Sequence, residues 1–308
     1  MKFSLTLILT SLILFISSCS MTPNQDYVKP NLSLNIETSN KNKEIIIQSL
    51  LKDGTIFSIN FDNEDSYLLD DDILNSKLKY FCKSLIEEER EVLEKNIFEN
   101  KKSPNKKVLV VYSEGFQNYA SLLKNKYPQE EYSLVKFGDF DSQIKTILNV
   151  DDSEKKYKDL LRLDKYIKIS HIPRIRNDIS SIYFITDYDI GKTIVPIFRS
   201  YTLSTDTFSS SEIFHDANDI KKLVDFENTY IPITNKMIEN ISEKQDSLIK
   251  NEVENTLIRD FLTIEKINQN NLFRENLLPD SGNNKVKRNG CLDRDLNLWQ
   301  VSTSNFTS

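Results

Sequence analysis

The sequence predicts an α/β fold built on a largely parallel β-sheet. Two unbroken apolar runs, Val108–Tyr112 and Ile182–Ile185, have the character of strands buried on both faces of a sheet. Segments with apolar residues at helical spacing follow both runs, and this alternation is typical of βαβ units joined by right-handed crossovers. A hydrophobic fraction of 39% and a charged fraction of 28% in 308 residues suit a globular chain with a sizeable core.

The alternation is clearest over residues 104–215. After the first run we expect, in order, a helix over 116–123, a strand at Tyr132–Phe137, a helix near 144–148 and a polar helix over 151–168. The second run leads into a helix, Ile190–Tyr201, that Pro196 interrupts, and then into a strand at Phe208–Phe214.

The flanking regions are less regular. Before residue 104 the sequence shows apolar stretches at Leu32–Ile36, Ile45–Leu51 and Thr55–Phe61, then a predicted helix over 73–98. After residue 215 it shows a long helical region over 235–268 and a strand near Leu296–Val301.

The N-terminus has the pattern of a secretory signal peptide. A positive start, Met1-Lys2, precedes an uncharged run, Phe3–Ile16, that is shorter than the roughly 20 residues of a membrane-spanning helix. The ending Ile16-Ser17-Ser18-Cys19 resembles the bacterial lipobox, whose cysteine is acylated and becomes the new N-terminus. The alternative is an ordinary cleaved signal peptide with an incidental cysteine.

We therefore expect a signal peptide at 1–18, a lipidated tether at 19–31 and one folded region at 32–308. Several acyl chains on Cys19 would anchor the protein stably at a membrane surface. Ser20, rather than Asp, follows the cysteine, and by resemblance to enterobacterial lipoproteins this favours the outer membrane, with the protein facing the periplasm.

Several function classes lack their signatures. The net charge is −6 and no long basic run occurs, which disfavours nucleic-acid binding. His171 and His215 stand apart with no HExxH or CxxC spacing, so we expect no metal site. The six glycines form neither a P-loop nor GxGxxG, and no GxSxG occurs, so we expect no cofactor and no catalytic residue. The acidic runs Asp70–Asp72 and Glu87–Glu89 are interpreted as solvated.

The remaining cysteines and two arginines are the other candidate site residues. Cys82 and Cys291 could form a disulfide in an oxidising periplasm, or remain two buried thiols. Arg174 and Arg176 lie in a turn before a buried strand, where they could contact an anion or a protein partner. The alternative is a surface loop whose arginines pair with Asp178.

Residues 173–214 carry a family resemblance. Pro173–Thr186 is similar to the arginine-rich turn, Asp-Ile and apolar strand of the penicillin-binding protein activator lipoproteins (LppC/LpoA type). Ile194–Tyr201 resembles the helix that follows in that family, and Thr207–Phe214 stands in the place of its next strand. The resemblance implies a type I periplasmic-binding-protein-like fold of two α/β lobes without enzymatic activity.

The chain departs from that family in two respects. The tether leads straight into the predicted α/β region, so we expect no counterpart of the family's long N-terminal helical-repeat domain. Few residues before Val108 predict βαβ units, so we expect a reduced first lobe. The leading hypothesis is a non-enzymatic accessory protein of peptidoglycan assembly, with a class A penicillin-binding protein or another envelope-assembly protein as its partner and no small-molecule ligand. The alternative is a solute-binding lipoprotein of a transporter, which would need a cleft between two complete lobes.

Overall fold

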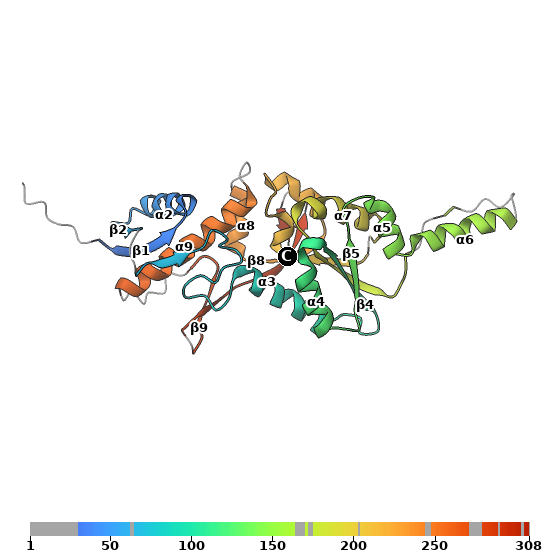
Figure 1. The fold of residues 1–308 in the computed structure, drawn as a ribbon, viewed down its shortest axis with the longest axis horizontal. Coiled ribbons are helices and arrows are strands. Elements are labelled where there is room, and N and C mark those ends of the chain that lie inside the picture. Colours follow the sequence, from blue (N-terminus) through green and yellow to red (C-terminus); the bar gives the residue numbers. More distant parts are fainter. Residues whose placement is uncertain are drawn as a thin grey trace, which may run out of the picture.

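The computed structural model describes residues 30–61, 65–163, 170–171, 175–202, 204–243, 248–270, 279–288, 290–302 and 305–307. They form two α/β lobes along one long axis (Figure 1). The predicted signal peptide, Cys19 and most of the tether lie outside the described residues.

The second lobe is built on a seven-stranded sheet. Its order is β12-β11-β8-β7-β6-β4-β5, in which β5, β4, β6, β7 and β8 are parallel and β11 and β12 join antiparallel at one edge. The strands are β4 (Lys107–Ser113), β5 (Glu131–Val135), β6 (Ile179–Ile185), β7 (Asp206–Ser209), β8 (Thr229–Ile233), β11 (Asn297–Ser302) and β12 (Asn305–Thr307). The predicted α/β class with a mostly parallel sheet is confirmed.

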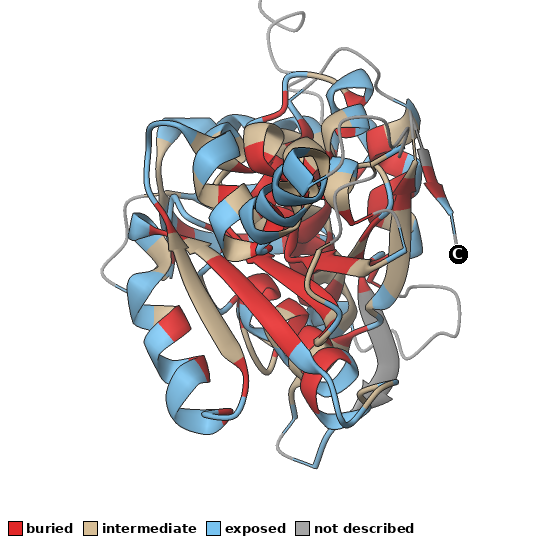
Figure 2. Cartoon of the chain, turned by 90° about the vertical axis from the view of Figure 1, so that its right-hand side faces the viewer, coloured by how far each residue is buried: buried red, intermediate tan, exposed pale blue. Residues whose placement is uncertain are grey.

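The two predicted apolar strands are direct neighbours. In the β4–β6 pair, Val110 lies opposite Tyr183 and Val111 opposite Phe184. Successive residues of β4 enter two different cores, one on each face of the sheet. Figure 2 shows these buried strands with helices outside them. Burial on both faces therefore explains why the runs contain no polar residue.

Different helices cover the two faces of this sheet. One core contains residues of α3 (Leu85–Glu94), the π-helix Lys95–Glu99 and α4 (Gln117–Lys126), which follows a 3-10 turn, Glu114–Phe116. The other contains residues of α5 (Phe140–Ile147), α7 (Tyr188–Tyr201) and the 3-10 helices Ser211–Phe214 and Ile220–Phe226. The helix α6 (Val150–Leu163) projects from the far end of this lobe (Figure 1).

The first lobe is small, as expected. Its parallel sheet has the order β2-β1-β3, from β1 (Leu32–Thr38), β2 (Phe57–Asn60) and β3 (Tyr67–Leu69). The helix α2 (Asn40–Lys52) joins β1 to β2, and α8 (Asn235–Glu243) and α9 (Ile249–Asn270) complete the lobe. A hairpin of β9 (Gly282–Val286) and β10 (Leu292–Arg294) follows α9.

The chain passes between the lobes more than once. The first crossing, residues 70–84, leads from β3 to α3. The chain returns between β8 and α8, and the last crossing, residues 279–296, leads through the hairpin into β11. The first and last crossings lie side by side, since a β-bridge pairs Phe81 with Leu292.

Several predicted elements were wrong in extent. The expected helix over 73–98 begins only at Leu85, because residues 73–84 form the irregular first crossing. The expected strand Phe208–Phe214 ends at Ser209 and turns into a 3-10 helix that buries Ile213 and Phe214. The expected helical region 235–268 is two helices, α8 and α9. Pro196 lies inside α7 without ending it.

Candidate functional site

A buried polar cluster occupies the carboxyl end of β7, at the sheet edge where open α/β sheets bind ligands. The Ser211 backbone N–H donates to Glu89 Oε2 at 2.8 Å, and Ser211 Oγ lies 2.7 Å from Glu89 Oε1. His215 Nε2 lies 2.8 Å from the same hydroxyl. Burial raises the pKa of Glu89 to about 8, partly opposed by its bonds to Ser211, and lowers the pKa of His215 to about 3.

This serine–histidine pair does not have the setting of a nucleophile. The exposed fractions of Glu89, Ser211 and His215 are 0%, 1% and 7%, so a substrate has no access to the hydroxyl. The cluster instead joins α3 to the end of β7. The interpretation of Glu87–Glu89 as a solvated face was therefore wrong for Glu88 and Glu89, which are both buried. Asp70–Asp72 are exposed, as expected.

The two lobes meet directly beside this cluster, at a contact that we call the lobe seam. At the N-terminus of α9, the Ile249 backbone N–H donates to the Ala217 carbonyl at 3.2 Å, and that of Lys250 donates to the His215 carbonyl at 3.1 Å. Ile249 is 1% exposed and Ala217 is fully buried. The first turn of a helix has N–H groups without intrahelical partners, and here the opposite lobe supplies acceptors for two of them.

The first and last crossings are fastened to each other. Cys82 and Cys291 form a disulfide, so of the two alternatives left by the sequence the structure contains the bridge. The Cys82 backbone N–H donates to the Leu292 carbonyl at 2.9 Å, and the Leu292 N–H donates to the Tyr80 carbonyl at 2.8 Å. The crossings therefore form one braced connection.

A buried ion pair links α3 to the same connection. Arg294 Nη1 lies 3.3 Å from Glu88 Oε2, and the Arg294 backbone N–H donates to the same oxygen at 3.0 Å. The guanidinium also lies over the Phe81 ring, 4.1 Å from its centroid. Burial raises the pKa of Glu88, while the neighbouring Arg294 lowers it. Removing either charge would leave the other buried and unpaired.

At the predicted arginine site, two carboxylates of the protein itself pair with Arg176. Arg176 Nη1 lies 2.5 Å from Glu131 Oε1, and Arg176 Nη2 lies 2.6 Å from Asp178 Oδ2. The hydrogen bonds to these carboxylates raise the pKa of Arg176. An anion would face both carboxylates, so the structure agrees with the pairing alternative at Arg176. Arg174 and Cys19 lie outside the described residues.

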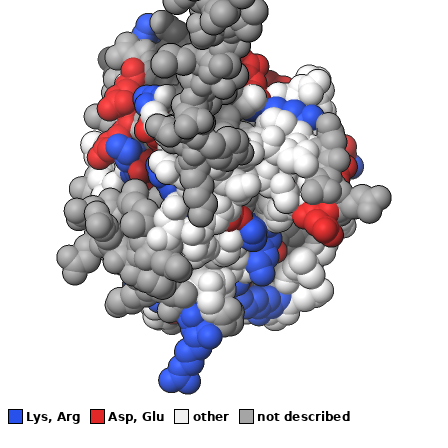
Figure 3. Space-filling model, turned by 90° about the vertical axis from the view of Figure 1, so that its left-hand side faces the viewer, with Lys and Arg blue, Asp and Glu red and all other residues white. Residues whose placement is uncertain are grey.

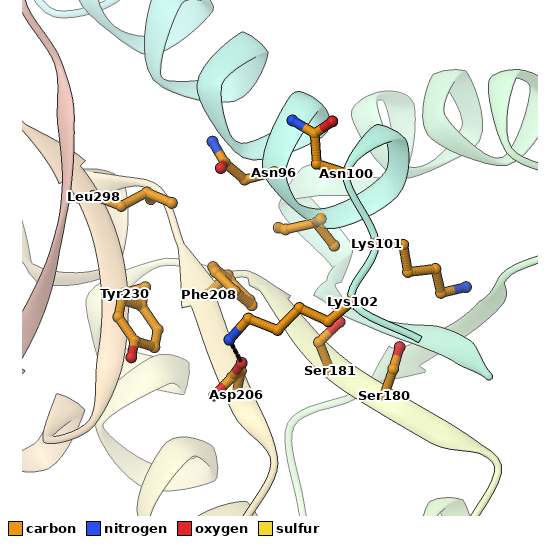
Figure 4. A pocket seen from close by; sticks show the side chains of 11 residues that line it. Asn96, Asn100, Lys101, Lys102, Ser180, Ser181, Asp206, Phe208, Tyr230 and Leu298 are labelled. Atoms are coloured by element: carbon orange, nitrogen blue, oxygen red, sulfur yellow. Dashed lines mark hydrogen bonds and ion pairs between the residues drawn. The ribbon is translucent and has the colours of Figure 1, made fainter. Parts of the chain in front are cut away.

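An open groove lies near the amino ends of β6, β7 and β8, and we call it the aromatic groove (Figure 4). Its volume is about 210 Å³. Its apolar part consists of Ile97, Phe208, Tyr230 and Leu298. Its polar part consists of Asn96, Asn100, Lys101, Lys102, Ser180, Ser181 and Asp206.

A ring stack and an ion pair hold four side chains of the groove in place. The Phe208 and Tyr230 rings stack with centroids 5.4 Å apart and an interplanar angle of 27°. Lys102 Nζ pairs with Asp206 Oδ2 at 2.6 Å across the opening, although 81% of the lysine side chain is exposed (Figure 4). The sequence could not indicate this groove, because its residues come from five separate segments.

A second, more polar pocket of about 260 Å³ lies in the first lobe between α2, α8 and α9. Arg259 lines it, and Arg259 Nη2 donates to Thr256 Oγ1 at 3.2 Å. Its Nε is buried without a hydrogen-bond partner among the described residues. We call this the polar pocket.

The described residues show neither a metal site nor a membrane-spanning helix. Among the described residues, no group of His, Cys, Asp and Glu is placed to hold a metal ion. None of the described helices is both long and apolar enough to cross a bilayer. At the first-lobe end, the visible Lys and Arg side chains form small separate groups rather than a continuous basic face (Figure 3).

Comparison with protein-family models gives no match, and comparison with curated proteins gives none either. Among solved structures, the chain is similar to an extracellular ligand-binding receptor from Desulfohalobium retbaense, at 9% identity and a TM-score of 0.48, covering 90% of this chain and 59% of that one. The C-domain of LpoA from Haemophilus influenzae, a regulator of PBP1A, matches at 10% identity and a TM-score of 0.39, with 89% and 81% covered.

A branched-chain amino acid ABC transporter protein from Rhodospirillum rubrum matches at 9% identity and a TM-score of 0.47, covering 90% of this chain and 99% of that one. The chain spans 47% of full-length LpoA. These identities and TM-scores are too low to indicate a function for this chain.

Proposed function

We propose that this protein is a non-enzymatic lipoprotein that serves as a docking body in cell-envelope assembly. In this proposal Cys19 holds it in the outer membrane, facing the periplasm, and its second lobe contacts an envelope-assembly protein such as a class A penicillin-binding protein. The observation that carries the proposal is the lobe seam.

A solute-binding protein holds its ligand between two lobes that close around it by hinge motion. In this protein, the N-terminus of α9 contacts the second lobe at the corresponding edge of its sheet, beyond the carboxyl end of β7. Opening the seam would expose Ile249 and Ala217 and release two backbone hydrogen bonds, each worth about 1 kcal/mol. The disulfide also fixes the first and last crossings to each other. A body with a closed seam suits protein docking better than solute capture.

The arrangement along the long axis supports the same function. The first described strand, β1, follows the predicted tether and lies at one end, while α6 lies at the other (Figure 1). An anchor on the tether would therefore leave the second lobe extended away from the membrane. That lobe carries exposed apolar side chains on α4 and α6, with Leu122 66% exposed and Leu160 49% exposed. These two positions lie on the lobe that the proposal assigns to the partner, so they serve as probes of contact there.

Site-specific crosslinking in cells tests the proposal. A photoreactive amino acid replaces Leu122 or Leu160 in the second lobe, and Leu51, which is 65% exposed in the first lobe, serves as the matched control. We expect mass spectrometry to identify an envelope-assembly protein crosslinked from the second-lobe positions and absent from the control. The proposal fails if neither second-lobe position yields such a protein.

The polar pocket favours the alternative, solute binding within the first lobe. The Arg259 guanidinium could bind the carboxylate of an amino acid there, and the acidic residues that line the same pocket, Asp53, Glu243 and Glu252, suit its ammonium group. A rise in Tm of several degrees on adding an amino acid, lost in Arg259→Ala, would establish this alternative. No shift with any of the twenty amino acids would exclude it for this class of solute.

A further inference from the structure

The aromatic groove combines an aromatic surface with amide, hydroxyl and charged side chains. Tyr230 is half-buried, so part of its ring faces the groove, and Phe208 stacks behind it. Asn96 and Asn100 are exposed on one side, and Ser180 and Asp206 lie on the other (Figure 4). An aromatic ring can receive an apolar ligand face while the surrounding polar groups bond to its edge.

The polar groups are matched to hydroxyl and amide ligands. An asparagine amide both donates and accepts hydrogen bonds, a carboxylate accepts them and a lysine donates them. The rim can therefore bond to hydroxyl and amide groups of a ligand, which also donate and accept. Its charges balance, because Lys102 pairs with Asp206 and Lys101 with Glu130 at 2.8 Å. A phosphate-bearing ligand, which would need an excess of positive charge, is therefore disfavoured.

We propose that the aromatic groove binds a sugar unit of an envelope glycan, with the Tyr230 ring under the apolar face of the sugar and Asn100 and Lys102 bonded to its hydroxyl or acetamido groups. A pyranose ring presents C–H bonds on its faces and hydroxyls around its edge, which is the division seen in the groove. The volume of about 210 Å³ suits one ring of a polymer, since pockets for whole drug-sized ligands are usually roughly 300–1,000 Å³. The inference rests on the proposed function only for placing the protein in the envelope.

The groove also lies apart from the lobe seam. It is near the amino ends of β6, β7 and β8, whereas the seam lies beyond the carboxyl end of β7. A glycan could therefore bind without opening the lobes, and a protein partner could contact α4 or α6 at the same time.

Binding is measured with the purified mature protein in detergent. The probes are N-acetylglucosamine tetramer, maltotetraose, isolated peptidoglycan sacculi and lipopolysaccharide in detergent micelles. We expect saturable binding to the N-acetylglucosamine tetramer, weakened about tenfold in Tyr230→Ala and several-fold in Asn100→Ala, whose side chain is exposed. Tyr230→Phe keeps the ring and should bind within about twofold of the natural protein. Phe137→Ala is the control, because Phe137 is an aromatic residue 91% exposed outside the groove.

Binding to sacculi that is lost in Tyr230→Ala identifies the wall glycan as the source. Such binding to lipopolysaccharide micelles alone identifies the lipid-linked glycan. The inference is overturned if no probe binds, or if Tyr230→Ala, with an unchanged Tm, binds as well as the natural protein. Because Asn100→Ala should not affect folding, it still tests the groove if Tyr230→Ala is unstable, and unweakened binding by Asn100→Ala would then overturn the inference. Crosslinking from Leu122 or Leu160 that persists without glycan binding would retain the proposed function and reject only the sugar site.

Discussion

The buried Glu89 carboxyl should make the stability of the folded protein depend on pH. Burial raises its pKa from 4.5 to about 8, so the folded protein keeps a proton that the unfolded chain releases. The contribution of this group to stability is therefore complete below pH 4.5 and is lost as the pH rises to about 8. One pKa unit corresponds to about 1.4 kcal/mol, so the loss between about pH 5.5 and 7.5 is roughly 2–3 kcal/mol.

Glu89→Gln removes this titration while keeping an oxygen that can accept a hydrogen bond from Ser211. The free energy of unfolding is measured by urea denaturation at a series of pH values. As the pH rises, it should fall less steeply in the variant than in the natural protein, with a difference in slope of about 1 kcal/mol per pH unit. Glu91→Gln, on the same helix with 61% of the side chain exposed, is the control and should follow the natural protein.

Two other buried groups, Asp260 and His215, also contribute to the pH dependence of stability, and comparison with the variant separates Asp260 from Glu89. Burial raises the pKa of Asp260 to about 7, which gives a loss of the same sign as the pH rises. Burial lowers the pKa of His215 to about 3, so its contribution is present above pH 6.5 and is lost as the pH falls toward 3. Asp260 is unchanged in Glu89→Gln, and its effect cancels in the difference. Parallel pH curves for the natural protein and Glu89→Gln would refute the reasoning.

Three further predictions concern the anchor and the core. Cys19→Ala should abolish membrane attachment, and incorporation of radiolabelled palmitate at the natural level would contradict the lipobox assignment. Val110→Asp should prevent folding, because Val110 is fully buried and an unpaired buried charge costs several kcal/mol against a total of roughly 5–15 kcal/mol; a soluble variant that melts cooperatively would contradict this. Gly191→Ala should lower the free energy of unfolding by roughly 1–3 kcal/mol, because its methyl would lie 2.6 Å from Ile213 Cγ1. Gly115→Ala, with no atom within 4 Å of the added carbon, should change it little, and equal losses in both would show that the contact is relaxed at no cost.

The sequence predicted best where local pattern and tertiary burial agree. The runs that became β4 and β6 are apolar because both faces of the sheet are covered, so their character could be recognised without knowing their neighbours. The helix expected over 73–98 failed at its start. Leu78 and Cys82 have helical spacing with the residues of α3, but they belong to a crossing that is held by the disulfide and by backbone bonds to β10.

The buried carboxylates of Glu88 and Glu89 show a second limit of prediction from the sequence. A run of three glutamates is usually solvated, and only distant partners make burial acceptable here. Glu89 bonds to Ser211, 122 positions away, and Glu88 bonds to Arg294, 206 positions away. The aromatic groove has the same property, since Asn100, Asp206 and Tyr230 approach one another only in the folded sheet.

The buried contacts of Glu88 and Glu89 both involve α3. Glu88 holds the last crossing, while Glu89 holds the end of β7 beside the lobe seam. The π-helix that continues α3 supplies Asn96 and Ile97 to the aromatic groove. One continuous helical segment thus connects the braced crossings, the closed edge of the sheet and the open groove. Because these contacts fix α3 to the last crossing and to the second lobe, the groove is held in a preformed shape, and a ligand there would meet little cost of ordering the protein.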